Sequence, residues 1–457
     1  MGRLFGTDGV RGLANVGPMT PEMVLALGRA VVQVLAPVLP SEKPRVLVGR
    51  DTRLSSPMLE ASLVAGLCAA GADVLTVGVL PTPGVAYLVR HTGAVGGIVI
   101  SASHNPYMDN GIKVFDHTGT KLDDGLEEAI EARLSRLETA IPLTGEALGS
   151  PSPYTESVRH YSDFLQRIFS PAAPLDLRIG LDCANGAATV VAPTLFQQLC
   201  RVVYVWHATP DGRNINHQCG AVHPAFLQQQ VVAEKLDVGF AFDGDADRLI
   251  AIDHTGRILD GDYILAICTQ ALCAATSLPR LVVSTVMANY GLEQALREMG
   301  CTLSRTPVGD KYVVEGMHRT GAQLGGEQSG HILFLQHHTT GDGLLTAIQL
   351  LNAMAAQQLP LATLAQVLRK CPQTLLNVPI RERRDPLALP GVQHAVAEAE
   401  QALGAAGRVV VRLSGTEAAA RVMVEGPDQQ QIDGLAQHIS HAISQVLGRI
   451  EAPAEAG

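Results

Sequence analysis

The stretch Val238-Gly-Phe-Ala-Phe-Asp-Gly-Asp-Ala-Asp-Arg-Leu-Ile-Ala-Ile-Asp253 places a polar core between two apolar runs. The runs have the length and composition of two short buried strands, and the core is predicted to be the loop between them. Along extended backbone, Asp243, Asp245 and Asp247 point to one side, and a slight curl converges their oxygens. Because three converging carboxylates repel one another, the stretch predicts an all-oxygen site for a hard cation, Mg²⁺ or Ca²⁺.

Two other interpretations of this stretch follow from the residues alone. An ordinary acidic turn would be solvated, which the apolar flanks disfavour. A calcium loop of the EF-hand type needs glycine where Arg248 stands and a bidentate glutamate where His254 stands, so the pattern excludes it.

The composition indicates a globular protein of about three or four domains. Of its 457 residues, 47% are hydrophobic and 17% are charged, and the formal net charge of −10 argues against nucleic acid as a partner. We expect no membrane span and no secretory signal, because the longest apolar run carries Arg29 and Gln33 and the N-terminus lacks an apolar core. Eight cysteines without Cys-x-x-Cys pairs suit a reducing cytoplasm.

The order strand, loop, helix, strand, helix, strand occurs three times, starting near Val46, Ile179 and Leu281. Polar loops at residues 101–106, 243–248 and 327–331 occupy matching places in these units. Any α/β chain shows such alternation, but polar loops at equivalent positions favour a true repeat. The sequence therefore predicts an α/β protein with three similar mixed-sheet domains.

The last part of the chain, from about Cys371, has strand patterns followed by a closing helix at residues 429–447, which predicts a small α+β domain. The tail, residues 451–457, is expected to be disordered. The predicted domain boundaries are 1–155 with the serine loop, 156–256 with the acidic loop, 257–370 with the third polar loop, and 371–457.

Three further segments carry chemical groups. Ser101-Ala-Ser-His-Asn-Pro106 offers an accessible serine beside a histidine, which suits a nucleophile or phosphate carrier, although serine-rich turns are common. Lys113 follows nearby, and a solvated surface lysine is its simpler interpretation. Arg412-Leu-Ser-Gly-Thr-Glu417, with Arg421 on the next strand, suits a phosphate dianion or a plain hairpin turn. Glu327-Gln-Ser-Gly-His331 suits sugar hydroxyls or a structural loop.

Taken together, these loops resemble the α-D-phosphohexomutase family over nearly the whole chain. The motifs that carry the resemblance, in family order, are Phe5-Gly-Thr-Asp-Gly-Val-Arg-Gly12, Ser101–Pro106, Asp243–Arg248, Gly326–His331 and Ser414–Glu417. The N-terminal motif, Gly49-Arg-Asp-Thr-Arg53 and Thr339-Thr-Gly-Asp-Gly343 look most like its phosphoglucosamine mutase branch. The alanines at 418–420 depart from the family pattern, which usually has proline after Ser-Gly-Thr-Glu.

The resemblance implies a role for each matching residue. Ser103 is expected to be the phosphorylated serine and, with Asp243, Asp245 and Asp247, to bind Mg²⁺. Glu327 and Ser329 are expected to bind sugar hydroxyls. The expected ligands of the non-reacting phosphate are Arg412, Ser414, Gly415, Thr416 and Arg421. The general acid or base stays open among Lys113, if desolvation lowers its pKa, His331 and His104; Arg11 is a poor proton acceptor, and Arg248 is expected to orient the site.

The implied reaction interconverts glucosamine 6-phosphate and glucosamine 1-phosphate through a hexosamine 1,6-bisphosphate. Four domains around a central cleft, and a homodimer, are further expectations from the family. A phosphoglucomutase or phosphomannomutase of the same family, a non-catalytic sugar-phosphate-binding regulator, and a metal-dependent phosphatase remain alternatives at this stage.

Overall fold

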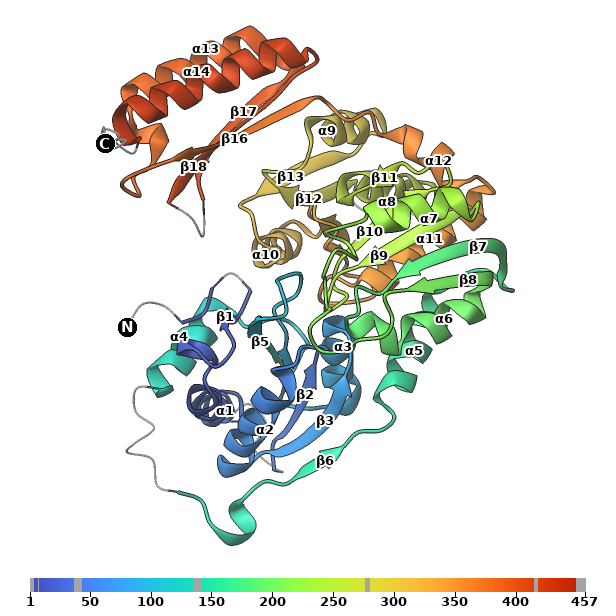
Figure 1. The fold of residues 1–457 in the computed structure, drawn as a ribbon, viewed down its shortest axis with the longest axis vertical. Coiled ribbons are helices and arrows are strands. Elements are labelled where there is room, and N and C mark those ends of the chain that lie inside the picture. Colours follow the sequence, from blue (N-terminus) through green and yellow to red (C-terminus); the bar gives the residue numbers. More distant parts are fainter. Residues whose placement is uncertain are drawn as a thin grey trace, which may run out of the picture. The chain divides into compact units, whose positions relative to one another are not determined.

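The computed structural model of the chain describes residues 4–6, 8–36, 43–134, 142–275, 280–414 and 418–448. The chain forms two compact units, one of Met1–Met287 with Met299–Val367 and the other of Ala288–Glu298 with Leu368–Gly457. Three β-sheets belong to the first unit and a fourth to the second (Figure 1). The tail predicted to be disordered, residues 451–457, lies outside the described residues.

The first sheet is mixed and has the strand order β1-β5-β4-β2-β3-β6. Strands β4, β2, β3 and β6 run parallel, whereas β5 is antiparallel to both of its neighbours. Its strands are β1 (Val10–Leu13), β2 (Arg45–Arg50), β3 (Asp73–Val79), β4 (Gly96–Ile100), β5 (Asp109–Asp116) and β6 (Pro151–Pro153). The reversal between β4 and β5 places a loop at the carboxyl end of a parallel strand, where α/β sheets bind their ligands.

The second and third sheets repeat this arrangement, with the orders β11-β10-β9-β7-β8 and β13-β12-β14-β15. In each, the last parallel strand is followed by an antiparallel neighbour, β9 by β10 and β14 by β15. The strands are β7 (Leu175–Asp182), β8 (Cys200–Trp206), β9 (Val238–Phe242), β10 (Leu249–Asp253), β11 (Ile258–Leu259), β12 (Leu281–Thr285), β13 (Thr302–Thr306), β14 (Leu324–Gly326) and β15 (Ile332–Phe334). The predicted threefold recurrence is confirmed, and each of its three polar loops connects a parallel strand to an antiparallel one.

Helices pack on both faces of the first sheet. Helices α1 (Pro21–Leu35), α2 (Ser56–Ala69) and α4 (Asp124–Leu134) share one apolar core with β2 and β4. Helix α3 (Thr82–Thr92) packs on the opposite face, where Val85 lies against Gly49 and Gly97. The remaining helices of the first unit are α5 (Ser157–Ile168), α6 (Ala192–Leu199), α7 (Ala225–Ala233), α8 (Gly261–Ala275), α10 (Asp310–Thr320), α11 (Gly343–Gln357) and α12 (Leu361–Leu364).

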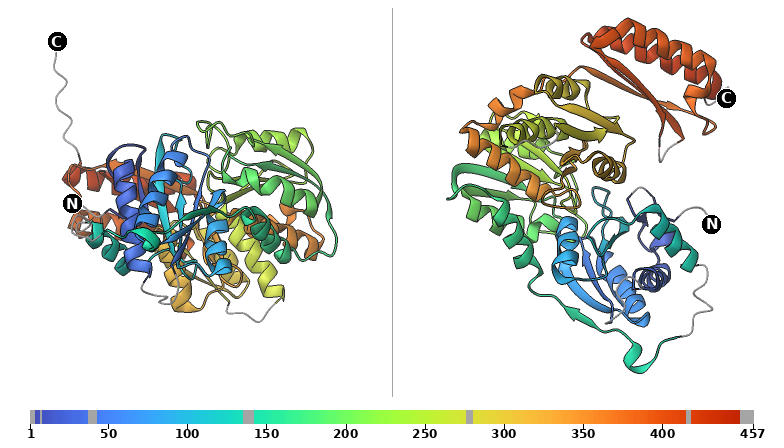
Figure 2. Two further views of the ribbon diagram at one scale, coloured as in Figure 1. Left: turned by 90° about the horizontal axis from the view of Figure 1, so that it is seen from below. Right: turned by 180° about the vertical axis from the view of Figure 1, so that it is seen from behind.

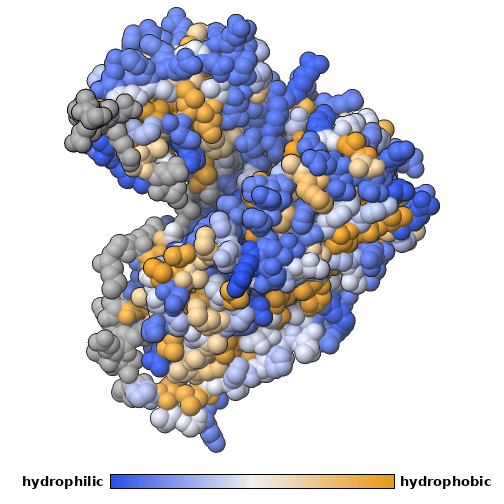
Figure 3. All heavy atoms as spheres, viewed as in Figure 1, coloured by the Kyte–Doolittle hydropathy of each residue, from blue (hydrophilic) through white to orange (hydrophobic). Residues whose placement is uncertain are grey.

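The second unit contains an antiparallel sheet of order β16-β18-β17. Its elements are α9 (Tyr290–Glu298), β16 (Gln373–Pro379), α13 (Pro390–Leu403), β17 (Arg408–Leu413), β18 (Ala419–Glu425) and α14 (Gln429–Leu447). Helices α13 and α14 lie side by side on one face of this sheet (Figure 2). Their outward side is mainly hydrophilic (Figure 3), while Ile432, Ile439 and Ile443 of α14 are buried against the strands. The predicted small α+β domain is confirmed, including the bounds of its closing helix.

Among the described residues, no helix has both the length and the apolar character that crossing a membrane requires.

Two glycines allow the close approach of α1 and α2. A Cβ on Gly66 would lie 2.1 Å from the carbonyl oxygen of Leu25, and one on Gly28 would lie 2.7 Å from that of Leu63. Since these neighbours are backbone atoms, no side-chain rotation relieves the contact. The two glycines therefore set the separation of the helices that cover the sheet carrying Ser103.

Replacing Gly66 with alanine is expected to destabilise the protein. The helices must separate to admit the Cβ, and overpacking of this kind costs about 1 to 3 kcal/mol. Urea unfolding followed by circular dichroism measures the change. Ser62→Ala, on the partly exposed side of the same helix, is the control and should change the free energy of unfolding by no more than about 0.5 kcal/mol. Equal stabilities of the two variants would contradict the close helix contact.

Candidate functional site

Asp243, Asp245 and Asp247 lie in the turn that connects β9 to β10. Ala246 is left-handed (φ 58°), and its N–H donates to the carbonyl oxygen of Asp243 at 3.0 Å. The expectation of extended backbone is therefore wrong, because a tight turn, not strand alternation, brings the carboxylates together. All three side chains are buried, and one oxygen from each lies within 4.8 Å of the others. We call these three residues the acidic triad.

Ser103 reaches the acidic triad from the loop between β4 and β5. Its backbone is left-handed (φ 51°), and its Oγ donates a hydrogen bond to Oδ2 of Asp243 at 2.6 Å. Nδ1 of His104 lies 3.3 Å from the same Oγ. Burial and the positive charge of Arg248 lower the pKa of His104 to about 4, so this imidazole is neutral at neutral pH. The Ser103 hydroxyl proton is thus directed to Asp243, and the residues predicted at positions 103 and 243 are in contact.

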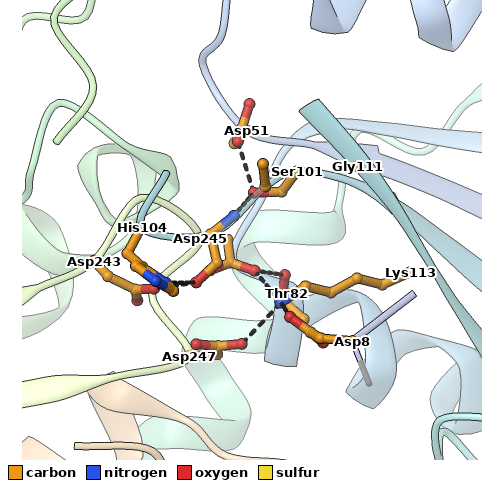
Figure 4. A network of polar contacts seen from close by, with 12 residues as sticks. Asp8, Asp51, Thr82, Ser101, His104, Gly111, Lys113, Asp243, Asp245 and Asp247 are labelled. Carbon is orange, nitrogen blue, oxygen red and sulfur yellow. Dashed lines mark hydrogen bonds and ion pairs between the residues drawn. The ribbon is translucent and has the colours of Figure 1, made fainter. Parts of the chain in front are cut away.

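Lys113, on β5, is buried among carboxylates. Its Nζ lies 2.8 Å from Oδ2 of Asp245, 3.0 Å from Oδ2 of Asp247 and 3.2 Å from Oδ2 of Asp8 (Figure 4). Burial by itself would lower the pKa of Lys113, but these three carboxylates raise it well above its ordinary value. The simpler interpretation of Lys113 as a surface lysine is therefore excluded, and the condition for its role as a base, a lowered pKa, is not met.

Asp8 and Thr82 belong to the same polar network, although neither was predicted as a site residue. Asp8 forms an ion pair with Arg11, whose guanidinium also donates to the carbonyl oxygen of Ala102 at 3.4 Å. Thr82, at the start of α3, donates from Oγ1 to Oδ2 of Asp245 at 2.5 Å. Asp8 lies within the N-terminal motif, so the sequence contained a signal for it. Thr82 and Asp245 are 163 residues apart, so no local sequence pattern predicts their contact.

Arg53 holds the backbone of the serine loop in place. Its buried guanidinium pairs with Asp51, Nε to Oδ2, at 2.7 Å and donates to the carbonyl oxygens of Ser103 and Asn105, each at 2.9 Å. From the loop between β8 and α7, Nδ2 of Asn216 donates to the carbonyl oxygen of Ser103 at 2.9 Å. The motif that contains Arg53 was used only as evidence of the family resemblance. The role of Arg53 in positioning the serine loop was therefore not predicted.

Residues 327–331 reach the acidic triad mainly through His331. Its Nδ1 lies 3.5 Å from Oδ1 of Asp247, and its Nε2 lies 3.6 Å from Oδ2 of Asp310. Although burial opposes it, these carboxylates raise the pKa of His331. Glu327 accepts the Gly309 N–H at 3.2 Å, and burial raises its pKa. Ser329, in contrast, is exposed.

Arg248 follows the acidic triad directly. Its backbone N–H donates to Oδ1 of Asp243 at 3.1 Å, and its Nε lies 3.9 Å from Oδ1 of Asp247. Although burial opposes it, the carboxylates of Asp243, Asp247 and Glu327 raise the pKa of its guanidinium. Arg248 therefore places a fixed positive charge beside the site.

In the second unit, Arg412 on β17 lies directly opposite Arg421 on β18. Burial and the charge of Arg421 lower the pKa of Arg412, and like charges opposite each other destabilise a sheet. Ser414 is buried, and its carbonyl oxygen accepts from Arg383 at 2.7 Å, which adds a third cation that sequence analysis missed. This part of the chain therefore suits an anion. Two other predicted phosphate ligands, Gly415 and Thr416, lie outside the described residues.

The acidic triad fits a hard divalent cation. Its ligands are all oxygens, which Mg²⁺ and Ca²⁺ prefer. Oδ1 of Asp245 is buried and has no hydrogen-bond partner within the part of the chain that the structure describes. Burial and repulsion from Asp247 and Asp245 raise the pKa of Asp243 to about 8. Without a cation, the triad thus retains a proton at neutral pH, and a divalent ion would displace it.

Asp243→Asn is expected to stabilise the metal-free protein. The folded-state pKa of Asp243 is about 8, whereas the unfolded value is about 3.9. The folded wild type holds a proton that the unfolded chain has released, so its stability falls as pH rises from about 4 to 8. Because asparagine does not ionise, the variant does not lose stability over this pH range. It also keeps the two hydrogen bonds of Asp243, since the asparagine oxygen accepts from the Arg248 N–H and the asparagine NH₂ group donates to Ser103 Oγ.

Thermal unfolding in a chelator tests this prediction. Near pH 8, the variant should be more stable than the wild type by about 1 to 3 kcal/mol, and the difference should shrink near pH 5. Added Mg²⁺ should raise the melting temperature of the wild type more than that of the variant. A variant less stable than the wild type at both pH values would refute the assigned repulsion.

The chain matches four family models in succession. The models of phosphoglucomutase/phosphomannomutase alpha/beta/alpha domains I, II and III match residues 2–140, 152–256 and 260–371, and the model of the C-terminal domain matches residues 375–442. Together these matches extend over most of the chain.

Curated relatives and solved structures agree with these matches. The phosphoglucosamine mutase of Moorella thermoacetica is 50% identical over 439 residues, covering 95% of this chain and 98% of that protein. That of Brevibacillus brevis is 47% identical over 449 residues, covering 98% and 100%. A phosphoglucomutase/phosphomannomutase family protein from Burkholderia thailandensis has a TM-score of 0.80 at 25% identity, covering 97% of each chain.

At 18% identity, the Aspergillus fumigatus N-acetylphosphoglucosamine mutase, solved with GlcNAc-6P and magnesium, shares the fold, with a TM-score of 0.66 and coverage of 97% and 95%. The solved structure at 18% identity shows only a shared fold, whereas the family models and the identity to curated relatives also show the family. The chain belongs to the phosphoglucomutase/phosphomannomutase family of phosphohexomutases, in its phosphoglucosamine mutase branch.

Proposed function

We propose that this protein interconverts glucosamine 6-phosphate and glucosamine 1-phosphate. The observation that carries the proposal is the 2.6 Å hydrogen bond from Ser103 Oγ to Asp243 within the buried acidic triad. It places a hydroxyl that can carry a phosphoryl group beside ligands for a divalent cation. Similarity to phosphoglucosamine mutases over nearly the whole chain favours the amino sugar over glucose or mannose phosphate.

Ser103, as phosphoserine, is the proposed phosphate carrier. In the first half-reaction, the bond from Ser103 Oγ to phosphorus breaks, a bond forms from phosphorus to the free hydroxyl oxygen of the substrate, and the proton of that hydroxyl passes through the proton-transfer groups to Ser103 Oγ. The products are hexosamine 1,6-bisphosphate and free serine. In the second half-reaction, the bond from the other phosphorus to its sugar oxygen breaks, that phosphoryl group bonds to Ser103 Oγ, and the serine proton passes to the released sugar oxygen. A trace of bisphosphate therefore phosphorylates, and so activates, unmodified enzyme.

Asp243, Asp245 and Asp247, together with the phosphoserine, are the proposed ligands of Mg²⁺. When bound, this ion supplies positive charge that offsets the charge on the phosphoryl oxygens. Thr82 and Lys113 hold Asp245 in place, as described above. Since phosphoryl transfer depends chiefly on positioning and charge neutralisation, these buried contacts supply what the reaction needs from the protein.

Lys113 and His331 are the proposed proton-transfer groups. The neighbouring carboxylates raise the pKa of both, so each can donate a proton to the oxygen that leaves, which is Ser103 Oγ in the first half-reaction and the sugar oxygen in the second. His104, whose pKa is lowered to about 4, is neutral and lies beside Ser103, where it can accept a proton. Arg11 and Arg248 remain charged and orient the phosphoryl group, because a guanidinium does not give up its proton.

Substrate recognition is assigned to two other loops. Glu327 and Ser329 are proposed to bind sugar hydroxyls or the amino group. Arg412, Ser414, Gly415, Thr416 and Arg421 are proposed to bind the phosphate that is not reacting. A dianion between Arg412 and Arg421 would remove the repulsion across β17 and β18.

Three proposals about organisation come from the resemblance and the sequence. The domains are 1–155, 156–256, 257–370 and 371–457. The protein forms a homodimer, which sedimentation would test. It works in the cytoplasm, a proposal supported by its eight cysteines, all of them free thiols, as is typical of a reducing compartment.

Ser103→Ala is expected to lower isomerisation by more than about 1000-fold, because the variant lacks the hydroxyl that is proposed to carry the phosphoryl group. Incubation with glucose 1,6-bisphosphate followed by peptide mass spectrometry should show one added phosphoryl group on Ser103 in the wild type and none in the variant. Ser62→Ala, which changes a serine away from the site, is the control for turnover, and circular dichroism checks the fold. Near-normal turnover by Ser103→Ala would rule out the phosphoserine mechanism.

A substrate panel tests the sugar. With Mg²⁺ and a trace of hexose 1,6-bisphosphate, turnover of glucosamine phosphate should exceed that of glucose or mannose phosphate by more than about tenfold, as a site built for a polar substituent discriminates strongly. A preference for glucose or mannose phosphate would keep the mechanism and overturn the assigned substrate.

A further inference from the structure

A second cluster of ligand groups lies in the second sheet, apart from the acidic triad. Asp182 ends β7, His207 follows β8, and Cys219 lies in the loop that precedes α7. One carboxylate oxygen, one imidazole nitrogen and the Sγ atom lie within 4.8 Å of one another. Cys219 and Asp182 are fully buried, whereas 26% of the His207 side chain is exposed, which leaves a route from solvent.

The contact between His207 and Asp182 suits a shared ion. Nδ1 of His207 lies 3.1 Å from Oδ2 of Asp182. This nitrogen is buried, yet it has no well-aligned hydrogen-bond partner among the residues described. Nitrogen and oxygen ligands of one tetrahedral zinc ion, each about 2.0–2.1 Å from the metal, lie about 3.3 Å apart. The observed distance of 3.1 Å between Nδ1 of His207 and Oδ2 of Asp182 is close to that value. The two atoms are not aligned for a hydrogen bond.

The cluster is already oriented by its surroundings. Oδ1 of Asp182 accepts from the Ala184 N–H at 2.9 Å, and Oδ2 accepts from the Gly220 N–H at 3.0 Å. Outer hydrogen bonds of this kind fix metal ligands, and Oδ2 keeps a second lone pair. The His207 ring packs against Phe226, with ring centroids 4.6 Å apart and planes at 64°. Little rearrangement is therefore needed to admit an ion.

The donor set distinguishes this cluster from the acidic triad. A thiolate with an imidazole and one carboxylate favours Zn²⁺ and related ions over Mg²⁺ or Ca²⁺, which prefer oxygen ligands. Three protein ligands leave one tetrahedral position for water. Burial and the charge of Asp182 raise the pKa of the Cys219 thiol to about 12, so ion binding must release its proton.

We propose that Asp182, His207 and Cys219 form a binding site for one thiophilic divalent ion, with Zn²⁺ as the expected occupant. The ion would join the ends of β7 and β8 to the loop before α7. That loop also contains Asn216, whose Nδ2 donates to the carbonyl oxygens of Ser103 at 2.9 Å and Asn105 at 3.2 Å. The site therefore braces the contact between the second sheet and the serine loop.

Co²⁺ binding to the full-length reduced protein, freed of metal by a chelator, tests the proposal. A bound thiolate produces a sulfur-to-cobalt charge-transfer band in the near ultraviolet, and the all-oxygen triad cannot produce it. We expect this band to grow with added Co²⁺ until it saturates, and we expect Zn²⁺ to displace the cobalt and remove the band. Absence of the band in the wild type would overturn the proposal.

Matched variants locate the ion. Cys219→Ser should remove the charge-transfer band, whereas Cys200→Ser, which changes a buried cysteine at the other end of β8, should keep it. Asp243→Asn, in the acidic triad, should also keep it. His207→Gln should weaken Co²⁺ binding more than about tenfold.

Two results would refute the assignment: a band of full strength in Cys219→Ser, or unchanged Co²⁺ affinity in His207→Gln. Because His207 is partly exposed, the second variant decides the question if Cys219→Ser does not fold. The melting temperature gives a further readout, since Zn²⁺ should raise that of Cys200→Ser more than that of Cys219→Ser. Equal shifts in these two variants would also count against the site.

Discussion

Electrostatic repulsion among three buried carboxylates is the constraint on which the site depends. Asp243, Asp245 and Asp247 lie in one tight turn, where desolvation makes their charges costly. Without a cation, the structure offsets this cost in two ways: Lys113 pairs with two of the carboxylates, and the raised pKa of Asp243 keeps a proton on the third. A divalent ion would offset the repulsion more completely, and the all-oxygen ligands of the triad fit such an ion.

The threefold topology explains how the groups meet. Each of the three sheets reverses direction after its last parallel strand, and each reversal carries a polar loop. The first loop supplies Ser103, the second the acidic triad, and the third His331. The loops occupy equivalent places in three similar sheets of the first unit. Each sheet therefore contributes a different chemical group to the site: a hydroxyl, three carboxylates and an imidazole.

The serine loop shows how backbone strain is maintained. Ser103 has a left-handed conformation, which costs free energy for a residue with a side chain, and such residues concentrate at functional sites. The buried Arg53 and Asn216 both donate to the Ser103 carbonyl oxygen and so hold the loop in this conformation from two different segments, which follow β2 and β8. The serine hydroxyl is consequently directed at Asp243 before any substrate arrives.

The sequence by itself determined the alternation of strands and helices, the threefold repeat and the positions of the polar loops between strands. These features depend on local periodicity and composition, as in the apolar runs around Asp243 and the closing helix at residues 429–447. It did not determine the backbone of the acidic turn, which is a tight left-handed turn at Ala246 instead of a curled strand.

Only the tertiary structure decided the environment of each group. Lys113 is buried and its pKa is raised because Asp245 and Asp247, more than 130 residues further along the chain, pack around it. The contact of Thr82, the positioning role of Arg53 and the cluster of Asp182, His207 and Cys219 could likewise not be predicted from the sequence, since each depends on contacts between distant segments. Charge, burial and hydrogen bonding are set by three-dimensional proximity, and local sequence patterns do not contain that information.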